Sequence, residues 1–423
     1  MTRRTLLNRD FLLLWQGQFV SQLGNQAFSL AMVYWLMEAT GSASLMGLLM
    51  MVSLLPGVVI GPLGGAIADR HSRLGIIVVS DLVRGLAVLA LAGVMFLRPQ
   101  GTELIVGMLF AVALFSGLVN AVFQPAIAAA IPDLVPPQKV AAGNSLTQFS
   151  VQASVLVGQA AGGLLYRFFG AAYLFFIDGA TYLVSAFSEA FIRIPQKRPG
   201  EKLPTKQTLA AYISDTVEGI RFVWRRPGMR SFLLVASGVN FLAMPVIILL
   251  PFYVADRLVK DSAWYGFLLA ALGAGSLLGY LVAGTIRISA RRRPWLITSA
   301  LIGTGTLLAT VGFVRGPVIA LALFFGVGTC TGAINIFVIT LFQIATPSDM
   351  RGRVIALVIA LSGAATPLGM ALGGLLGDAT NKNIPLIYFA CGALIGLLVV
   401  GAATRRTFHE FLEWDAPATS GAF

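Results

Sequence analysis

Long apolar runs, broken by short polar segments, make up most of the chain. A helix needs about 20 mainly apolar residues to cross the hydrocarbon core of a bilayer. The pattern predicts twelve such helices, at residues 11–37, 44–68, 75–97, 102–131, 144–166, 171–192, 230–254, 263–286, 294–314, 317–345, 354–378 and 384–404. Because backbone groups in lipid must be satisfied within the protein, the predicted fold class is an all-α polytopic membrane protein.

The composition excludes a soluble protein. Of the 423 residues, 57% are hydrophobic and only 11% are charged, and the mean hydropathy is +0.83, whereas an average soluble domain is about 25% charged. The first apolar run follows Met1 and a short basic segment, and it lacks a small-residue cleavage site. We therefore expect a retained first helix and not a removable signal peptide.

Lys and Arg gather on one side of the predicted topology. If the N-terminus is cytoplasmic, the cytoplasmic segments hold 23 of them and the opposite side holds six. This bias predicts a multi-pass protein of the plasma membrane (the bacterial inner membrane) with both termini in the cytoplasm. Anionic lipid headgroups account for the formal net charge of +12 without a nucleic-acid partner.

One long polar segment divides the chain into two halves. We expect an N-terminal six-helix bundle at 1–193, a cytoplasmic linker at 194–229, a C-terminal six-helix bundle at 230–404 and a cytoplasmic tail at 405–423. Apolar residues recur with helical period in the second part of the linker, which predicts an amphipathic helix on the membrane surface or, alternatively, one that docks a partner. These residues are Leu209, Tyr212, Ile213, Val217, Ile220, Val223 and Trp224.

The two halves repeat each other. The pattern GxxxGGLL occurs at 158–165 and again 211 residues later at 369–376. Six predicted spans separate the copies, so both have the same topology, and the halves are expected to be related by an axis along the membrane normal. The predicted architecture is therefore two parallel-repeat six-helix bundles, an arrangement typical of transporters.

Amide side chains lie inside several predicted spans. Asn25, Asn120, Asn240 and Asn335 fall near the middle of spans 1, 4, 7 and 10, and the two members of each symmetric pair are 215 residues apart. An amide in lipid would leave hydrogen-bonding groups unsatisfied, so these side chains either join helices or line a hydrated cavity. Their symmetry favours a substrate cavity. Further amides that extend it are Gln18, Gln22, Gln124 and Gln152.

Acidic residues inside the spans are candidates for proton coupling. Asp178 has no basic residue one turn away, so it could carry a proton; the alternative is a structural acid that is either neutral or bonded to a hydroxyl. Glu189 is the second candidate, although Arg193 at i+4 offers it a salt bridge. Asp81 and Arg84 are spaced to pair at the inner end of span 3.

The sequence contains no constellation for covalent chemistry. His71 and His409 fall in cytoplasmic segments, and Cys330 and Cys391 lie in apolar runs without ligand spacing. No GxxxxGK[ST] phosphate loop occurs either. We therefore expect a protein that is not an enzyme, with no cofactor and no metal site.

The loop between predicted spans 2 and 3, residues 65–73, reads GAIADRHSR. It resembles the G-x-x-x-D-R-x-x-R loop of the major facilitator superfamily. The resemblance implies a cytoplasmic gate, formed by Gly65, Asp69, Arg70 and Arg73, that holds the two halves together in one state. In physical terms Gly65 would permit close helix approach, and Asp69 would accept hydrogen bonds from a helix N-terminus.

More narrowly, the chain is similar to the drug:H⁺ antiporter branch that includes macrolide-efflux and enterobactin exporters. The similar segments are Asn8 to Phe11, Ala68 to Arg70, Ser80 to Gly85, Pro132 to Pro136, Asp178, Gly219 to Phe222, Thr346 with Pro347, and Arg351 to Val354. Three features depart from this pattern. Span 5 lacks a Gly-Pro step, span 4 has no embedded arginine, and the second-half loop at 287–293 has no aspartate.

The resemblance implies a secondary active exporter that works by alternating access, coupled to proton influx. An amide-rich, weakly charged cavity suits a bulky amphipathic small molecule, such as a macrolide-like drug or a siderophore. The expected partners are this substrate, protons and membrane lipids, and the protein is expected to be a monomer. Three alternatives remain open: a lysophospholipid or lipid-intermediate flippase, a nutrient importer, and a non-transporting receptor or channel.

Overall fold

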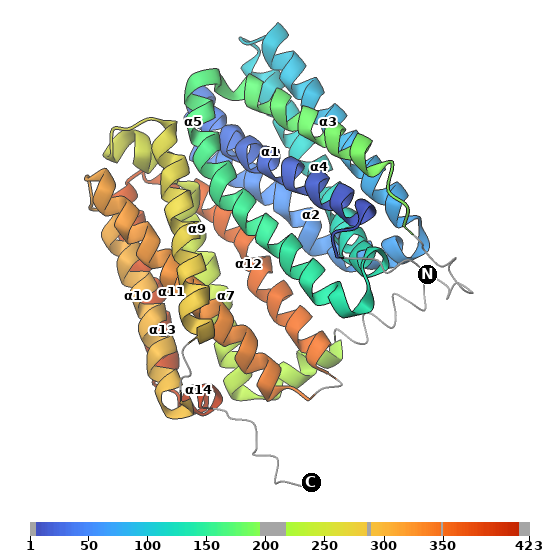
Figure 1. Cartoon of the computed structure of the whole chain (residues 1–423). Coiled ribbons are helices and arrows are strands. Elements are labelled where there is room, and N and C mark those ends of the chain that lie inside the picture. The colour runs from blue at the N-terminus through green and yellow to red at the C-terminus, as the bar shows by residue number, and fades with distance from the viewer. Residues whose placement is uncertain (1–5, 195–216, 286–288, 348–349, 414–423) are drawn as a thin grey trace. The chain divides into compact units, whose positions relative to one another are not determined.

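The structure is a computed structural model that describes residues 6–194, 217–285, 289–347 and 350–413 (Figure 1). Within these residues every regular element is a helix, and no strand occurs. The predicted all-α fold class is confirmed.

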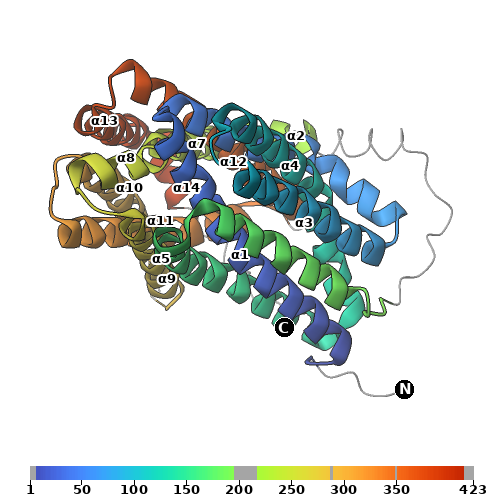
Figure 2. The ribbon, with the colours of Figure 1, turned by 90° about the horizontal axis from the view of Figure 1, so that it is seen from above.

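Five long helices account for the first half of the chain. They are α1 (Arg9–Thr40), α2 (Ala43–Arg70), α3 (Arg73–Leu97), α4 (Thr102–Leu134) and α5 (Val140–Glu189), with a 3-10 turn at Pro137–Lys139 before α5. The side chains of Asn8, Ser42 and Ser72 cap α1, α2 and α3 by accepting a backbone N–H bond in the first turn. Helices α1 and α5 run side by side (Figures 1 and 2).

Gly170 divides α5 into two spans. Its φ of 75° and ψ of 177° are not helical, and a positive φ of this kind is a conformation that glycine adopts readily and other residues rarely. The two parts correspond to predicted spans 144–166 and 171–192. A single continuous helix of 50 residues would be far longer than a bilayer requires.

The second half contains further long helices joined by short turns. The elements are α7 (Pro227–Ile248), α8 (Leu250–Phe252), a π-helical turn at Tyr253–Arg257, α9 (Ser262–Thr285), a 3-10 turn at Ala290–Arg292, α10 (Arg293–Val311), α11 (Pro317–Ala345), α12 (Arg351–Ala379), α13 (Ile384–Ala403) and α14 (Arg406–Leu412). Proline begins or nearly begins α7, α10, α11 and α13, a position where its missing N–H costs no helical bond.

The described helices include the twelve predicted spans. Ten helical segments are long and apolar enough to cross a membrane, and one of these is the broken α5 with its preceding turn. Counting α5 as two spans and adding the 32-residue α1 gives the expected number. Helix α1 has a lower mean hydropathy than its neighbours because it carries several Gln, Asn and Ser residues.

The described residues form two compact units. One comprises residues 6–194 with 254–270, and the other comprises 217–253 with 271–413. The beginning of α9 thus packs with the first half of the chain, whereas the sequence analysis placed all of 230–404 in the C-terminal bundle. The remaining predicted domain boundaries stay predictions.

Equivalent helices meet in the same way within each unit. A Cβ added at Gly158 on α5 would lie 3.1 Å from the Leu23 carbonyl oxygen and 2.7 Å from Cβ of Gln26 on α1. One added at Gly369 on α12 would lie 2.5 Å from the Phe241 carbonyl oxygen and 3.0 Å from Cβ of Met244 on α7. Gly369 follows Gly158 by 211 residues, and the contacted residues of α7 follow those of α1 by 218. The repeat detected in the sequence therefore recurs in the packing of its helices.

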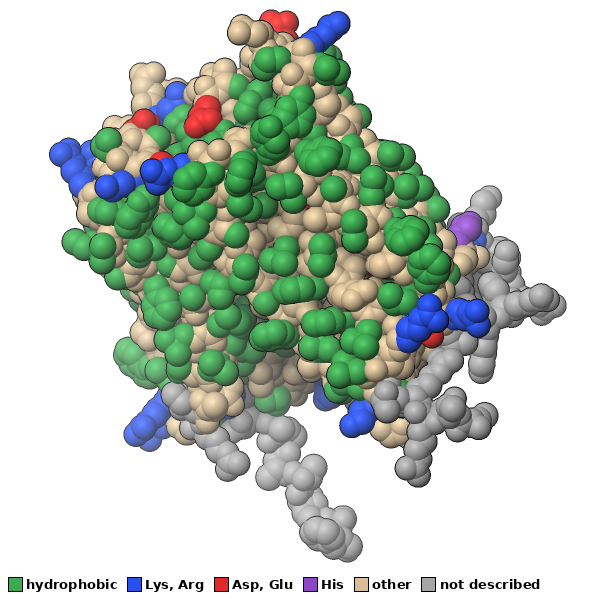
Figure 3. Space-filling view, turned by 45° about the horizontal axis from the view of Figure 1, so that its top comes forward, with side chains coloured by type: hydrophobic (Ala, Val, Ile, Leu, Met, Phe, Trp, Pro, Cys, Tyr) green, Lys and Arg blue, Asp and Glu red, His purple; other side chains and the backbone are tan. Residues whose placement is uncertain are grey.

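Large hydrophobic side chains are exposed along the spans. Phe168 and Val318 are each 71% exposed, and Leu397 is 68% exposed. Figure 3 shows hydrophobic side chains over the visible sides of the helices, with Lys and Arg gathered toward their ends. Such surfaces suit contact with lipid tails between two polar boundaries.

The parts of the predicted linker and tail that are described lie against the second unit. Residues 217–224 are helical; Val223 is fully buried, and Glu218 forms a 2.7 Å ion pair with Arg353 on α12. The rest of the predicted amphipathic helix lies outside the described residues. At the other terminus, α14 buries Phe408, Phe411 and Leu412.

Candidate functional site

The predicted cavity amides are mostly accessible. Asn25, Asn120, Gln124, Asn240 and Asn335 are exposed, whereas Gln22 and Gln152 are half-buried. The amide of Gln124 donates to Asn120 within α4, and Asn240 donates to the Ala236 carbonyl within α7. In the described part of the chain, neither bond joins two helices, which favours the cavity interpretation over helix-to-helix adhesion. Their role in binding substrate stays a prediction.

A buried polar cluster joins α1, α3 and α5 within the first unit. The Gln18 amide donates to Oε1 of Glu189 at 2.8 Å and lies 3.5 Å from Oδ2 of Asp81. The Arg84 guanidinium donates to Oδ1 of Asp81 at 2.9 Å. Asp81 and Glu189 are both 0% exposed, and Gln18 is only 6% exposed. Gln18 is therefore part of a network inside the protein, and its predicted role in binding substrate stays a prediction.

Aromatic rings enclose the cation of this cluster. The Arg84 guanidinium carbon lies 4.2 Å from the ring centroid of Phe123 and 4.9 Å from that of Tyr182. Cation–π contacts of this kind stabilise an arginine that is removed from water. Arg84 is 5% exposed, so it lies deep in the unit although its place near the end of a predicted span gave no sign of this.

Asp178 lies beside the cluster. It is 0% exposed, and neither carboxylate oxygen has a hydrogen-bond partner among the described residues. Helix α1 approaches Asp178 closely at Gly24. A Cβ at that position would lie 2.8 Å from Oδ1 of Asp178, so a larger residue would not fit without a shift. The hydroxyl-bonded alternative for Asp178 is not supported, since the nearby Thr181 hydroxyl donates to the Asp178 backbone carbonyl.

The expected salt bridge between Glu189 and Arg193 is wrong. Glu189 Oε1 accepts from Gln18, and its Oε2 has no hydrogen-bond partner in the described structure. The Arg193 backbone N–H donates instead to Oδ1 of Asp10. Because α5 ends at Glu189, the chain has left the helical path before it reaches Arg193, and the i+4 geometry is lost.

Three carboxylates are buried in the first unit. Asp81, Asp178 and Glu189 are all 0% exposed, and the one ion pair of these carboxylates among the described residues joins Asp81 to Arg84. Ionising all three would place a net negative charge in a low-dielectric interior, where an uncompensated carboxylate is costly. The role of Asp178 and Glu189 in carrying a proton stays a prediction.

The predicted gate motif is described in part. The Arg73 guanidinium donates to the Ala129 carbonyl at 2.9 Å and forms an ion pair with Asp133, both on α4. Among the described residues, a Cβ at Gly65 would meet nothing within 4 Å, whereas the neighbouring Gly64 lies against the Ala121 carbonyl; the role of Gly65 in a gate stays a prediction. Arg70 is half-buried, and the side chain of Asp69 lies outside the described side chains.

A second set of contacts holds the beginning of α9 against α5. Arg167 and Asp261 form a 2.8 Å ion pair, and the Ser262 hydroxyl donates to the Gly163 carbonyl at 3.1 Å. We call these four residues the α5–α9 contact. Helix α5 begins at Val140, on the same end of the unit as the gate loop. At 1.5 Å per residue, Arg167 lies about 40 Å farther along α5. The α5–α9 contact is therefore at the end of the unit opposite the gate loop. Sequence reasoning missed it because opposite charges in separate loops carry no pairing signal.

Comparison with known proteins decides the family. The model of the Major Facilitator Superfamily matches residues 14–361. The chain belongs to the major facilitator superfamily. It is accordingly a multi-pass membrane transporter and not an enzyme, as its twelve spans and parallel repeat predicted.

Two members of the superfamily with efflux names are similar over most of their length. Macrolide efflux protein A of Streptococcus pyogenes is 26% identical over 380 residues, covering 88% of this chain and 90% of that protein. Multidrug efflux pump Tap of Mycolicibacterium fortuitum is 28% identical over 380 residues, with the same coverage. These relatives agree with the resemblance to a drug-efflux branch.

Solved structures of the superfamily share the fold. A bacterial homologue of the human lysosomal transporter Spinster, inward-facing and unoccupied, aligns with a TM-score of 0.70 at 16% identity, covering 95% of this chain and 96% of that one. A bacterial homologue of the iron transporter ferroportin aligns with a TM-score of 0.69 at 18% identity, covering 95% and 100%. At these identities the likeness shows the fold alone.

Proposed function

We propose that this protein exports a bulky amphipathic small molecule, of the macrolide-like drug or siderophore class, in exchange for protons. The observation that supports the coupling is a group of three buried carboxylates, Asp81, Asp178 and Glu189, of which only Asp81 forms an ion pair with Arg84 among the described residues. A group that must lose a proton on one side of the membrane and gain it on the other has to be enclosed and short of counter-charge, as Asp178 is.

The proposed cycle uses the cluster as follows. When Asp178 is protonated it is neutral, and the positive charge of Arg84 compensates Asp81, with which it pairs at 2.9 Å. When the proton leaves, Asp178 becomes a second anion within reach of Arg84, and the guanidinium is drawn between the two. Gln18 transmits such a shift to Glu189 and to α1, the helix that also carries the exposed Asn25.

The direction of transport is proposed from the relatives and from the exposed amides. Efflux-named relatives align with 88% of the chain. Neutral amides on α1, α4, α7 and α11 offer hydrogen bonds without imposing a charge, and this suits a large, weakly charged substrate. The α5–α9 contact would have to open for that substrate to leave at its end of the unit.

The location and assembly are also proposals. The distribution of Lys and Arg supports insertion in the bacterial inner membrane with both termini cytoplasmic. On this orientation the gate loop faces the cytoplasm and the α5–α9 contact faces outward. We propose that a single chain surrounded by lipid performs the cycle.

A panel of inhibitors tests the function. Cells that express the protein should accumulate less of at least one macrolide-like compound or siderophore than cells that express the Asp178→Asn variant at equal level. A protonophore should abolish the difference. Unchanged accumulation across the panel, together with movement of a labelled lysophospholipid between leaflets, would replace the exporter by a lipid flippase. Accumulation that rises on expression would indicate uptake.

A further inference from the structure

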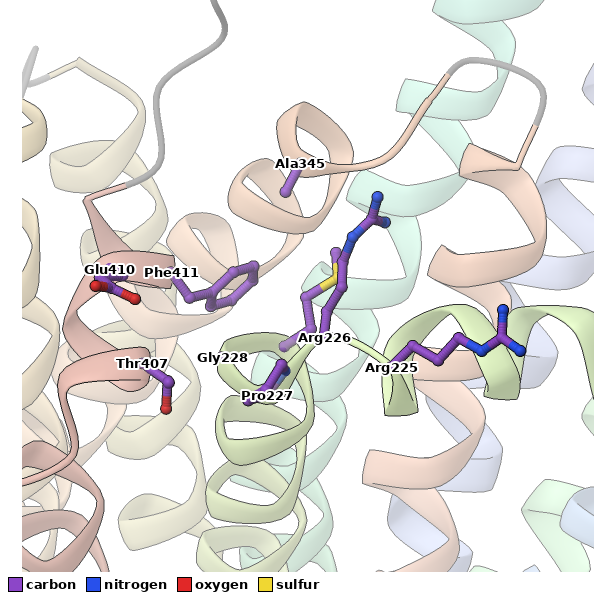
Figure 4. A pocket seen from close by; sticks show the side chains of 9 residues that line it. Arg225, Arg226, Pro227, Gly228, Ala345, Thr407, Glu410 and Phe411 are labelled. Atoms are coloured by element: carbon purple, nitrogen blue, oxygen red, sulfur yellow. The ribbon is translucent and has the colours of Figure 1, made fainter.

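A cavity of about 240 Å³ opens at one end of the second unit, where α7 begins. It is lined by residues that precede and start α7, by the last residue of α11 and by one side of α14 (Figure 4). It is separate from the buried polar cluster, which belongs to the first unit.

The floor of this cavity is apolar and closely packed. The Phe411 ring of α14 lies 6.0 Å from that of Phe232 on α7 and 5.2 Å from that of Phe342 on α11. Gly228 allows α14 to lie directly on α7, since a Cβ there would come within 2.5 Å of the Thr407 carbonyl oxygen. The floor therefore has a fixed shape rather than one that forms around a ligand.

Two arginines at the mouth have no acidic partner among the described residues. No ion pair joins Arg225 or Arg226 to any residue in the described ranges, and both are exposed. Arg226 stacks on Phe222 with its guanidinium carbon 3.6 Å from the ring centroid. The one acidic residue of the lining, Glu410, is paired with Arg406 at 2.8 Å.

The mouth of the cavity carries positive charge. Figure 4 shows the Phe411 ring turned toward the stem of Arg226, with Arg225 extending along the surface away from α14. Arginine forks match the paired oxygens of a phosphate. The charge of the site is therefore positive over an apolar floor.

The surroundings point to a lipid. The helix that leads into Arg225 exposes Val217, Ile220 and Trp224, at 45%, 37% and 45%, and these lie on one face at helical spacing. An exposed tryptophan beside aliphatic residues and arginines is typical of the membrane–water interface. We propose that this cavity binds the phosphate headgroup of an anionic phospholipid, with its glycerol and acyl chains along that exposed face.

Lipid binding to the full chain tests the proposal. The purified protein, delipidated in a mild detergent, is titrated with phosphatidylglycerol or phosphatidylethanolamine, and bound lipid is counted by native mass spectrometry. Variant R225Q/R226Q removes the two cations. Variant R291Q/R292Q is the matched control, because it removes two adjacent exposed arginines that precede α10. Ala345→Leu narrows the cavity without changing charge.

We expect phosphatidylglycerol to bind the parent protein more tightly than phosphatidylethanolamine. R225Q/R226Q should weaken it about tenfold or more, since each interfacial arginine contributes about 1 kcal/mol toward an anionic lipid. Ala345→Leu should weaken it as well, and R291Q/R292Q should change it less than twofold. Thermal unfolding of each variant confirms that it is folded.

Three results would overturn the proposal. Equal loss in R225Q/R226Q and R291Q/R292Q would mean that charge alone acts, without a site. Because both lipids carry a phosphate, equal affinity for them would show that the net negative charge of the lipid plays no role. Displacement of the lipid by equimolar inorganic phosphate would assign the cavity to a free anion. None of these readouts depends on transport, so the proposed exporter function is tested separately.

Discussion

Gln18 on α1 and Glu189 at the end of α5 are joined by a 2.8 Å hydrogen bond, although 171 residues separate them. The same Gln18 amide reaches Asp81 on α3, so one neutral side chain connects two buried carboxylates from different helices. This relationship ties the position of α1 to the charge state of the acids that it touches.

Replacing Gln18 by leucine should destabilise the protein by about 1–3 kcal/mol, because both carboxylates lose a donor that water cannot replace. Thermal unfolding in detergent measures the change. Gln22→Leu is the matched control: Gln22 lies one turn away, and its Oε1 has no hydrogen-bond partner in the described structure. Equal losses in the two variants would show that the Gln18 bonds do not matter.

Replacing Arg84 by glutamine should cost more, about 3–5 kcal/mol, since it leaves Asp81 buried without its cation. The double variant Arg84→Gln with Asp81→Asn should recover much of that loss, because it removes the uncompensated charge. Arg98→Gln, at an exposed position that ends the same helix, serves as the control. Failure of the second substitution to restore the melting temperature would contradict the pairing.

Adding one methyl group at Gly24 should impair proton-driven transport. Its Cβ would lie 2.5 Å from the Thr181 hydroxyl oxygen and 2.8 Å from Oδ1 of Asp178, so α1 and α5 must separate or Asp178 must turn. Overpacking of this kind costs about 1–3 kcal/mol. Gly93→Ala, where the added atom meets nothing within 4 Å, should transport normally. Normal transport by Gly24→Ala would place Asp178 outside the mechanism.

Breaking the ion pair of the α5–α9 contact should favour the state open at that end. The pair is half-exposed, with side chains 54% and 36% accessible, so Arg167→Gln should remove roughly 0.2–1 kcal/mol. That corresponds to at most about a fivefold change in an equilibrium constant. The measurement is the rate of maleimide labelling at Ser262→Cys, 4% exposed in the parent, with Cys330 and Cys391 replaced by serine.

In that assay Arg98→Gln should leave the labelling rate unchanged. The reversed pair, Arg167→Asp with Asp261→Arg, should return the rate toward that of the parent. A labelling rate that Arg167→Gln leaves unchanged would show that the α5–α9 contact does not control access.

The fold was predictable because it depends on properties that are local in the chain. Apolar runs placed the spans to within a few residues, for example 317–345 for α11, whose bounds are the same in the structure. The GxxxGGLL motif that begins at Gly158 and at Gly369 repeats in the sequence, and both glycines make close contacts with a neighbouring helix in the structure. The joining of two spans in α5 was not foreseen, since a glycine with positive φ bends the chain without a polar loop.

The site was predictable only in part. The sequence singled out Gln18, Asp178 and Glu189 by their polarity, but it could not show which of them meet. Pairing across α1, α3 and α5 depends on helix rotation, and polarity alone does not fix that rotation. For this reason Glu189 was expected to pair with Arg193, and its bond to Gln18 was not foreseen.

The most direct test of the account is proton-driven transport in proteoliposomes. The parent protein and Asp178→Asn are reconstituted at equal density, and uptake of a labelled substrate from the inhibitor panel is measured with and without an imposed pH gradient. The account predicts that the gradient accelerates transport by the parent protein only, while both proteins bind the substrate with the same affinity. Equal acceleration of Asp178→Asn by the gradient would contradict it.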